Sequence, residues 1–335
     1  MHKLLLVADI GGTKTDLYLL ASDGSDFRPL IKQRYNSHAY PQFEGMLHEF
    51  ITLAAPEIKQ RPIDGCCLGI AGAVNTETAQ VTNLPWVINS VTLQDMFGIK
   101  QIKLINDFAA IGYGIESLQQ KDLCVLQPAQ AVAQATRVVI GAGTGLGEGY
   151  LVWQGNGYIP LASEGGHTDF APRNAIQHDL LRYLQDRFGH VSYERVVSGT
   201  GLLNIYEFLV TRMTPSLALK NALAESADHA ATLTTFALQE KDALAIQVLN
   251  IFIDCYGAQA GNLALTCLAR GGVYIAGGIA PKILARMQRV DFIQSFCDKG
   301  RFSKLMQTIP VSVVLSPDVS WMGAARVAMQ LSQNK

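Results

Sequence analysis

Apolar residues near the N-terminus follow the patterns of β-strands, whereas those in the second half follow the longer period of helices. Three consecutive strands joined by short turns are predicted at residues 3–9, 14–21 and 27–35. A helix is expected near 42–55. The continuous apolar runs 66–74 and 101–107, separated by a short helix, are typical of strands covered on both faces. This part is expected to form a mixed sheet flanked by helices, with Asp107 at the C-terminal end of a strand, where ligands bind in such sheets.

After a Gln- and Ala-rich stretch at 117–136, a second strand-turn-strand pattern begins at 138, as if the plan of the N-terminal part restarted. Helical periodicity then predicts helices near 173–188, 200–211, 214–226, 228–240 and 243–269. A strand at 271–279 and a last helix at about 322–333 complete the chain.

The last helix has no obvious partner in sequence, so we expect it to return to the first domain. The expected domains are a small α/β domain of residues 1–117 plus 318–335 and a large α/β domain of residues 118–317.

Both strand-turn-strand patterns turn at glycines, in VADIGGTKTDLYLL at 7–20 and VVIGAGTGLGEGYL at 138–151. The glycines are Gly11, Gly12, Gly141, Gly143, Gly145 and Gly147. Glycine allows positive φ and keeps side chains away, so backbone N–H groups can converge on an anion, and Thr13 and Thr144 add hydroxyl donors. One such hairpin is more often structural, but two in one chain favour a nucleotide site. Neither is a Walker A loop, because the Gly-Lys-Ser/Thr ending is missing and a strand follows each turn.

Composition argues for a small-molecule enzyme. Charged residues make up 16%, hydrophobic residues 49%, and the net charge is -1, so no broad basic surface for nucleic acid is expected. The six cysteines have no C-x-x-C or C-x-C spacing, which signals neither zinc nor a redox pair. The apolar run 4–8 is too short for a signal peptide, and polar residues interrupt 243–269, so we expect a cytoplasmic protein with no membrane span.

Seven ordered motifs, spread over nearly the whole chain, make it resemble the bacterial glucokinase family, zinc-free hexose kinases of the actin-like, RNase H-like group. The motifs are DIGGTK at 9–14, TNLPW at 82–86, LINDFAAIGYGI at 104–115, GAGTGLG at 141–147, SEGGHTDFAP at 163–172, ERVVSGTGL at 194–202 and GGVYIAGGI at 271–279. A related repressor and kinase group shares DIGGTK, but carries a Cys-rich zinc motif that is missing after 163–172 here.

This resemblance implies a two-lobed actin-like ATPase fold of the α/β class, with ATP in the cleft between the lobes and the sugar deeper in the same cleft. It implies phosphorylation of glucose at the 6-hydroxyl to give glucose 6-phosphate and ADP, with Mg²⁺ as cofactor. A homodimer is also expected from the resemblance.

By the same resemblance, Asp107 is the general base and Asn106 its neighbour on the sugar hydroxyls. Phosphoryl transfer needs positioning, charge stabilisation and a carboxylate that accepts the proton of the attacking hydroxyl. An Asn-Asp pair can supply both functions. The alternative is that Asn106 and Asp107 only cap the helix that begins at Phe108.

Glu164, His167 and Glu194 match family positions that contact the ring hydroxyls of the sugar. Carboxylates accept hydrogen bonds from hydroxyls and histidine can donate or accept, so selection among sugars is expected to be stereochemical. Each such charge-assisted bond contributes about 1.5–3 kcal/mol. A core position for His167 and a solvated or capping role for Glu194 are the alternatives.

For the nucleotide, the resemblance implies a set formed by Asp9, Gly11, Gly12, Thr13, Gly143, Thr144, Gly145, Gly277 and Gly278. The turn residues would bind phosphates, and Gly277 and Gly278 would lie nearer the adenosine. Asp9 would hold Mg²⁺ through water, or alternatively brace the turn through its N–H groups. Lys14 stands where many relatives have Asn, so its contact with phosphate stays open.

Three other functions stay open at this point: a kinase of an amino or N-acetyl hexose, a sugar-sensing regulator that does not phosphorylate, and an actin-like filament ATPase. The first strand is expected to start at about residue 3, which leaves no room for a DNA-reading helix-turn-helix. A filament-forming ATPase would have no use for the candidate sugar ligands Glu164 and His167. A glucose kinase is therefore the favoured prediction.

Overall fold

The computed structural model describes residues 2–24, 26–59, 61–289 and 292–333. They fall into two compact units, the first of Met1–Gln119, Tyr158–Ala162 and Ser316–Lys335 and the second of Gln120–Gly157 and Ser163–Leu315. The domain bounds expected from the sequence stay a prediction.

The first unit contains a five-stranded sheet, a three-stranded sheet and the helices around them. Its elements are β1 (Lys3–Ile10), β2 (Lys14–Ser22), β3 (Phe27–Asn36), η1 (Ser37–Ala39), α1 (Phe43–Ile58), β4 (Gly65–Ile70), β5 (Gly72–Val74), β6 (Thr78–Val81), β7 (Val87–Asn89), α2 (Ser90–Phe97), β8 (Ile102–Asn106), α3 (Asp107–Gly114), η2 (Ile115–Ser117) and α12 (Val319–Gln333).

The remaining elements form a six-stranded sheet and most of the helices, and one strand of this sheet, β12 (Tyr158–Ser163), falls largely in the first unit. These elements are η3 (Gln120–Asp122), β9 (Leu123–Gln127), β10 (Arg137–Ala142), β11 (Leu146–Trp153), β12 (Tyr158–Ser163), η4 (Gly165–His167), α4 (Ala175–Phe188), η5 (Tyr193–Arg195), α5 (Gly199–Val210), α6 (Leu217–Glu225), α7 (His229–Leu238), α8 (Ala243–Thr266), β13 (Val273–Ala276), α9 (Ala280–Met287), α10 (Phe292–Cys297), η6 (Gly300–Phe302), α11 (Ser303–Met306) and β14 (Val311–Val314).

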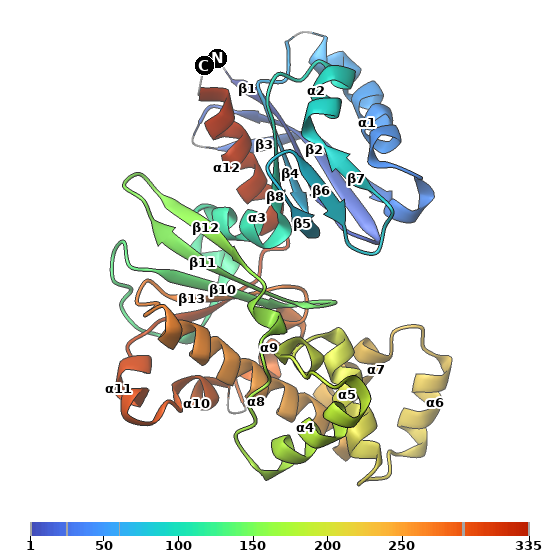
Figure 1. The fold of residues 1–335 in the computed structure, drawn as a ribbon, viewed down its shortest axis with the longest axis vertical. Coiled ribbons are helices and arrows are strands. Elements are labelled where there is room, and N and C mark those ends of the chain that lie inside the picture. The colour runs from blue at the N-terminus through green and yellow to red at the C-terminus, as the bar shows by residue number, and fades with distance from the viewer. Residues whose placement is uncertain (1, 25, 60, 290–291, 334–335) are drawn as a thin grey trace. The chain divides into compact units, whose positions relative to one another are not determined.

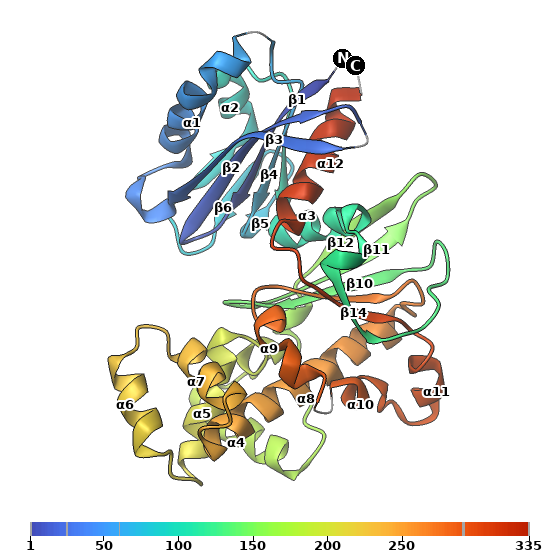
Figure 2. The same cartoon turned by 180° about the vertical axis from the view of Figure 1, so that it is seen from behind.

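The first sheet has the order β3-β2-β1-β4-β8, with β1 antiparallel to β2 and parallel to β4. On β1, Leu4 and Leu6 pack into the core with α1, whereas Leu5 and Val7 pack into the core with α12. The helices α1 and α2 cover one face of this sheet, and α3 and α12 cover the other (Figure 1, Figure 2). Because side chains alternate along a strand, Asp9 shares the face of Leu5 and Val7, toward α3 and α12.

The second sheet repeats this plan, as the sequence predicts. Its order is β12-β11-β10-β13-β14-β9, with β10 antiparallel to β11 and parallel to β13. The added edge strand β9 lies in the stretch 117–136, for which no strand was expected, and pairs antiparallel with β14. Only one of its five residues is fully buried, so its apolar pattern is weak.

Glycines and tight turns shift several predicted bounds. The run 66–74 is divided into β4 and β5 before Gly72. The strand expected at 271–279 is only β13, because Gly277 takes a φ of 80° and ends it. The last helix begins at Val319 rather than near 322, and the sequence pattern assigned no element to residues 280–321, where α9, α10, α11 and β14 form.

The long helix α8, predicted at 243–269, lies in the core of the second unit and is buried on nearly all sides. Among the described residues it is the one helix long and apolar enough to cross a membrane by length and composition, and 72% of that window is buried inside the protein. It ends at Thr266, three residues before the predicted end.

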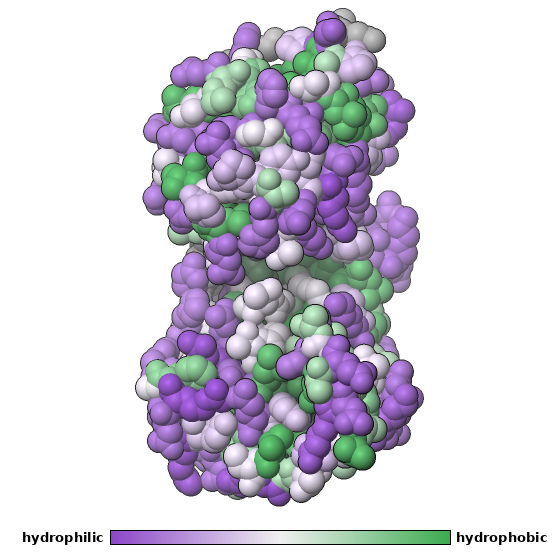
Figure 3. Space-filling model, turned by 90° about the vertical axis from the view of Figure 1, so that its right-hand side faces the viewer, coloured by the Kyte–Doolittle hydropathy of each residue, from purple (hydrophilic) through white to green (hydrophobic). Residues whose placement is uncertain are grey.

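The face in Figure 3 is mostly hydrophilic, with apolar residues scattered among polar ones. The large exposed apolar side chains come from many different elements, for example Val87, Met96 and Leu217. All six cysteines are free thiols, four of them buried and two, Cys124 and Cys267, half-buried.

Candidate active site

Asp107 is the first residue of α3 and directly follows β8. Asn106 is the N-cap, and its Oδ1 accepts a hydrogen bond from the Phe108 N–H at 2.9 Å while its Nδ2 donates to the Gly72 carbonyl at 3.2 Å. Asp107 Oδ1 accepts from the same N–H at 3.0 Å. Asn106 and Asp107 thus both cap α3, and this cap also fixes the Asp107 carboxylate at the edge of the sheet. Because a carboxylate has two oxygens, a cap through one of them does not prevent proton acceptance by the other.

A second carboxylate, Asp9, lies near the C-terminal end of β1, which is separated from β8 by β4 in the sheet. Burial, and next the negative charge of Asp9, raise the pKa of Asp107 to about 6. Burial is also the main cause that raises the pKa of Asp9, and the charge of Asp16 adds to it. The Ser320 hydroxyl faces Asp9 and opposes this rise, although its Oγ has no hydrogen bond of normal geometry. A buried carboxyl whose pKa is raised further by a neighbouring carboxylate lies where a proton or a cation is stabilised.

The first glycine turn closes on itself, with the Gly11 N–H donating to the Lys14 carbonyl at 3.0 Å. A Cβ on Gly12 would lie 2.8 Å from the Thr82 carbonyl oxygen, so a side chain there would clash with backbone. Thr13 and Lys14 are exposed. The described residues show no hydrogen bond from the turn to Asp9, which leaves the bracing alternative for Asp9 without support.

The second glycine turn is held by its neighbours. The Gly143 N–H donates to the Gly145 carbonyl at 2.8 Å, and Gly199, at the start of α5, donates to the Gly143 carbonyl at 2.8 Å. Glu194 Oε2 accepts from the Leu146 N–H at 2.8 Å, and a Cβ on Gly145 would lie 2.4 Å from the same oxygen. Glu194 therefore buttresses this turn, a role that its spacing in the sequence did not indicate.

The turn glycines do not use the positive φ that glycine allows. None of the six, all within the described ranges, is among the residues with positive φ. At Gly12 and Gly145 the reason for glycine is close approach to another group, as the clashes of an added Cβ show.

The sugar loop, which we define as residues 163–168, presents Glu164 and His167 to solvent. Their side chains are 88% and 61% exposed, and His167 Nε2 lies 3.9 Å from Glu164 Oε2. His167 is therefore not a core histidine. Gly166 is buried, and a Cβ on it would lie 2.1 Å from the Leu146 carbonyl oxygen. The loop and Glu194 thus both pack on the end of the second glycine turn.

Gly277 and Gly278 follow β13, which lies beside β10 in the sheet. A Cβ on Gly277 would lie 2.5 Å from the Ala142 carbonyl oxygen, and the Ile279 N–H donates to that carbonyl at 3.2 Å. The structure therefore brings Gly277 next to Ala142, the residue that precedes Gly143.

Glu148, which no sequence motif singled out, is a buried carboxyl of β11 that lies beneath the sugar loop. Burial raises its pKa to about 7, and the hydrogen bond from Gln259 opposes the rise. A lone acid in the apolar strand LGEGYLVW was the one signal that could have pointed to it.

Residues 6–331 match the model of the family described as Glucokinase. The chain is 44% identical to the glucokinase of Nostoc punctiforme over 343 aligned positions that cover 98% of this chain and 99% of that one. The glucokinase crystal structure from an Antarctic psychrotroph has a TM-score of 0.83 and 30% identity, covering 98% of this chain and 99% of that one.

At 18% identity, a ROK family glucokinase from Streptomyces griseus, solved with glucose and AMPPNP, shares the fold, with a TM-score of 0.65 and coverage of 98% and 99%. The actin-like α/β fold expected from the motifs is thereby confirmed. From the family match over nearly its whole length and the identity to Nostoc glucokinase, this chain belongs to the glucokinase family.

Proposed function

We propose that this chain transfers the γ-phosphoryl group of ATP to the 6-hydroxyl of glucose, with Asp107 as the general base. The chain is a glucose kinase by its family: the match covers nearly its whole length, and relatives at 43–44% identity are glucokinases. The observation that carries the mechanism is the Asp107 carboxyl, half-buried at the N-terminus of α3 beside Asp9. An amino-sugar kinase or a non-catalytic regulator is not favoured, because the full-length relatives are glucokinases.

In this mechanism, the attacking hydroxyl loses its proton to Asp107 as the bond to phosphorus forms. General-base assistance of this kind contributes roughly 10²–10⁴ in rate. A base whose pKa lies near the working pH combines a useful ionised fraction with a real driving force for proton transfer. Asn106, which caps α3, is proposed to donate to or accept from the sugar hydroxyls next to it.

We assign Glu164, His167 and Glu194 to the remaining sugar hydroxyls. The exposure of Glu164 and His167 leaves both side chains available to a ligand. Glu194 has one oxygen committed to the Leu146 N–H, and its second oxygen can accept from a hydroxyl.

The nucleotide phosphates are assigned to the two glycine turns and the adenosine to the side of Gly277 and Gly278. ATP is the donor favoured by the AMPPNP complex of the Streptomyces relative. Asp9 would hold Mg²⁺ through water. The described residues contain no group of three or more metal-ligating side chains, and a single carboxylate with water and phosphate oxygens is the usual shell of this ion. When bound, Mg²⁺ would neutralise charge that develops on the phosphates.

Removal of Mg²⁺ is expected to abolish turnover. With excess EDTA, ADP release from glucose and ATP should fall to background and return when Mg²⁺ is restored. Asp9→Asn should raise the Mg²⁺ concentration needed for half-maximal rate by about tenfold, since one charged ligand contributes roughly 1.4 kcal/mol or more. A variant with wild-type Mg²⁺ dependence would contradict the assignment of Asp9.

The kcat/KM for glucose is expected to fall in acid with a midpoint near pH 6. The pKa of Asp107 is raised to about 6, so the base is ionised above this pH and protonated, hence inactive, below it. A pH–rate profile between pH 5 and 7.5 measures this limb. A rate that stays flat down to about pH 4.5, where an ordinary carboxyl titrates, would show that another group accepts the proton.

We further propose that the protein is a cytoplasmic homodimer and that its domains are residues 1–117 plus 318–335 and residues 118–317. The dimer is supported by family resemblance. Sedimentation equilibrium should give twice the 36.4 kDa chain mass, and a value near 36.4 kDa would contradict it.

The direct test of the function is a coupled ADP assay with a sugar panel. ADP should form only when glucose, ATP and Mg²⁺ are all present, and the kcat/KM for glucose should exceed those for glucosamine and N-acetylglucosamine. Higher kcat/KM for either amino sugar would replace glucose as the substrate. Glucose binding without ADP would favour a regulator.

A further inference from the structure

Glu148 is the one carboxyl of the second sheet whose side chain lies fully inside the protein, 1% exposed, within the described part of the chain. Its Oε1 accepts a hydrogen bond from Gln259 Nε2 of α8 at 2.9 Å. Its Oε2 is buried and has no hydrogen-bond partner among the described residues. A Cβ on Gly165 would lie only 2.1 Å from this Oε2. The carboxyl therefore lies directly against the backbone of the sugar loop.

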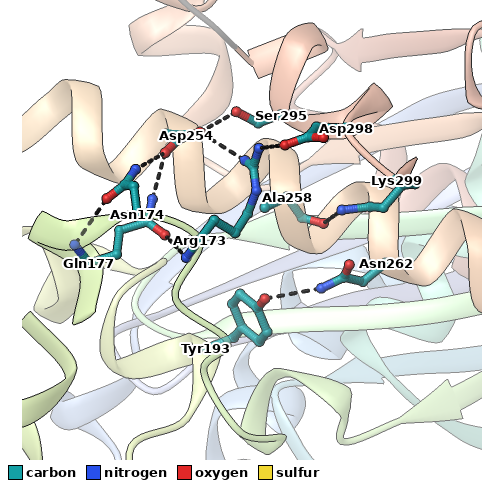
Figure 4. Close-up of polar contacts among 10 residues, drawn as sticks. All are labelled: Arg173, Asn174, Gln177, Tyr193, Asp254, Ala258, Asn262, Ser295, Asp298 and Lys299. Atoms are coloured by element: carbon teal, nitrogen blue, oxygen red, sulfur yellow. Dashed lines mark hydrogen bonds and ion pairs between the residues drawn. The ribbon is translucent and has the colours of Figure 1, made fainter. Parts of the chain in front are cut away.

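The same region of α8 also holds the segment that carries Glu194. Asn262 Nδ2 donates to Gln259 Oε1 at 3.2 Å and to the Tyr193 hydroxyl at 3.0 Å. Figure 4 shows the Tyr193 ring pointing toward Asn262. The Tyr193 N–H in turn donates to the Thr168 carbonyl at 3.0 Å, at the end of the sugar loop. One hydrogen-bonded chain, Glu148–Gln259–Asn262–Tyr193, thus joins the sugar loop to the residue that precedes Glu194.

Closer to the N-terminus of α8, Asp254 binds the polypeptide segment that follows the sugar loop, at Arg173 and Gln177. Its Oδ1 accepts from Arg173 Nη1 at 3.0 Å, and its Oδ2 accepts from Gln177 Nε2 at 2.5 Å (Figure 4). Ser295 of α10 also donates to this carboxylate. Because α8 is a continuous helix buried in the core, side chains that bond to it at several points are held at the spacing of its turns.

We propose that Glu148 is a positioning residue for sugar binding. Its carboxyl packs against Gly165 and supports the sugar loop. The hydrogen bonds through Gln259, Asn262 and Tyr193 keep the sugar loop and Glu194 at the spacing that the sugar requires. This inference rests on the proposed roles of Glu164, His167 and Glu194 as sugar ligands. Glu148 itself does not touch the substrate and acts through the loop.

The protonation state of Glu148 decides how well its carboxyl supports the sugar loop. Burial raises its pKa to about 7, so the carboxyl is neutral below that pH and charged above it. Charge on the unpartnered Oε2 would be uncompensated, and relief requires the loop to move or water to enter. The other ionisable groups around it are Tyr150 on β11 and Tyr256 on α8, both kept neutral by a pKa raised through burial, and Glu164 and His167 on the loop.

The test compares the wild type with Glu148→Gln, which keeps the shape and the acceptor for Gln259 but does not titrate. The KM for glucose, the KM for ATP and kcat are measured between pH 6 and 8. In the wild type the KM for glucose should rise about tenfold over this range, since one pH unit above the pKa leaves roughly a tenth of the carboxyl protonated. In Glu148→Gln it should stay near the low-pH value. The KM for ATP should be the same in both proteins.

Tyr193→Phe provides a second, independent variant that removes only the hydroxyl bound to Asn262. We expect its KM for glucose to rise about fivefold with kcat within about twofold, as the loss of one buried hydrogen bond predicts. In the double variant the two effects should be less than multiplicative, because both act through one chain. Glu225→Gln, an exposed change at the end of α6, is the matched control and should keep the wild-type profile.

Identical pH profiles of the KM for glucose in the wild type and Glu148→Gln would overturn the positioning role. So would a parallel rise of both KM values, which is what general damage to the fold produces. Either result leaves the proposed function intact, because glucose is still phosphorylated. A wild type that phosphorylates no glucose at any pH would instead overturn the proposed function on which this inference rests.

Discussion

Replacement of Asp107 by Asn is expected to lower kcat for glucose by roughly 10²–10⁴, with a much smaller change in the KM for ATP. The amide oxygen can still accept from the Phe108 N–H, as Oδ1 of Asp107 does, so the cap of α3 is kept. What the variant loses is the carboxylate oxygen that we propose takes the proton from the attacking hydroxyl. Steady-state kinetics at pH 7.5 measure this loss, and glucose binding by calorimetry shows that the site is still formed.

The matched control is Asn106→Asp, which keeps a capping acceptor at the neighbouring position, as Asp is a good N-cap. It should retain more activity than Asp107→Asn while losing the donor to the Gly72 carbonyl. If Asp107→Asn turned over glucose at the wild-type rate, Asp107 would be only the capping residue that its position also allows.

Replacement of Gly323 by Ala is expected to be the most destabilising single methyl addition in the first unit. A Cβ there would lie 1.8 Å from the Ala110 carbonyl oxygen and 2.6 Å from the Gly114 nitrogen. Across the same contact, a Cβ on Gly114 would lie 2.0 Å from the Val319 carbonyl oxygen. The helices α3 and α12 therefore meet backbone to backbone, and neither has a flexible side chain that can move aside.

We expect Gly323→Ala to cost about 3 kcal/mol or more, the upper range for overpacking. Because α3 begins at Asp107, a displaced α3 should also lower kcat. Calorimetric Tm and steady-state kinetics measure the two effects. Gly45→Ala in α1 is the control, since nothing lies within 4 Å of its added Cβ. It should raise stability by about 0.5–1 kcal/mol. Equal Tm shifts in the two variants would show that α3 and α12 are not tightly packed.

The parts of the fold that the sequence predicts are those decided by local pattern. The strands β1 and β2 and the helix α5 follow from apolar runs with clear turns or caps, and the predicted bounds differ by one residue. The edge strand β9 has one buried residue and depends on pairing with β14, nearly two hundred residues later. No local pattern records such a partner.

For the candidate site, residue types and motif order point to Asp107 and the glycine turns, but not to their contacts. That Glu194 binds the Leu146 N–H depends on residues 48 positions apart, and the Glu148–Gln259 bond joins residues 111 apart. Of the two properties of glycine considered for the turns, the structure uses the lack of a side chain, at Gly12 and Gly145, and not positive φ. Only the folded chain brings such groups together.

The central claim is that the Asp107 carboxylate takes the proton of the glucose 6-hydroxyl, and a crystal structure with glucose and a non-hydrolysable ATP analogue tests it most directly. The account predicts O6 within about 2.6–3.2 Å of an Asp107 carboxylate oxygen, with the γ-phosphorus on the far side of O6. A complex in which O6 is hydrogen-bonded to a different side chain and lies well away from Asp107 would contradict it.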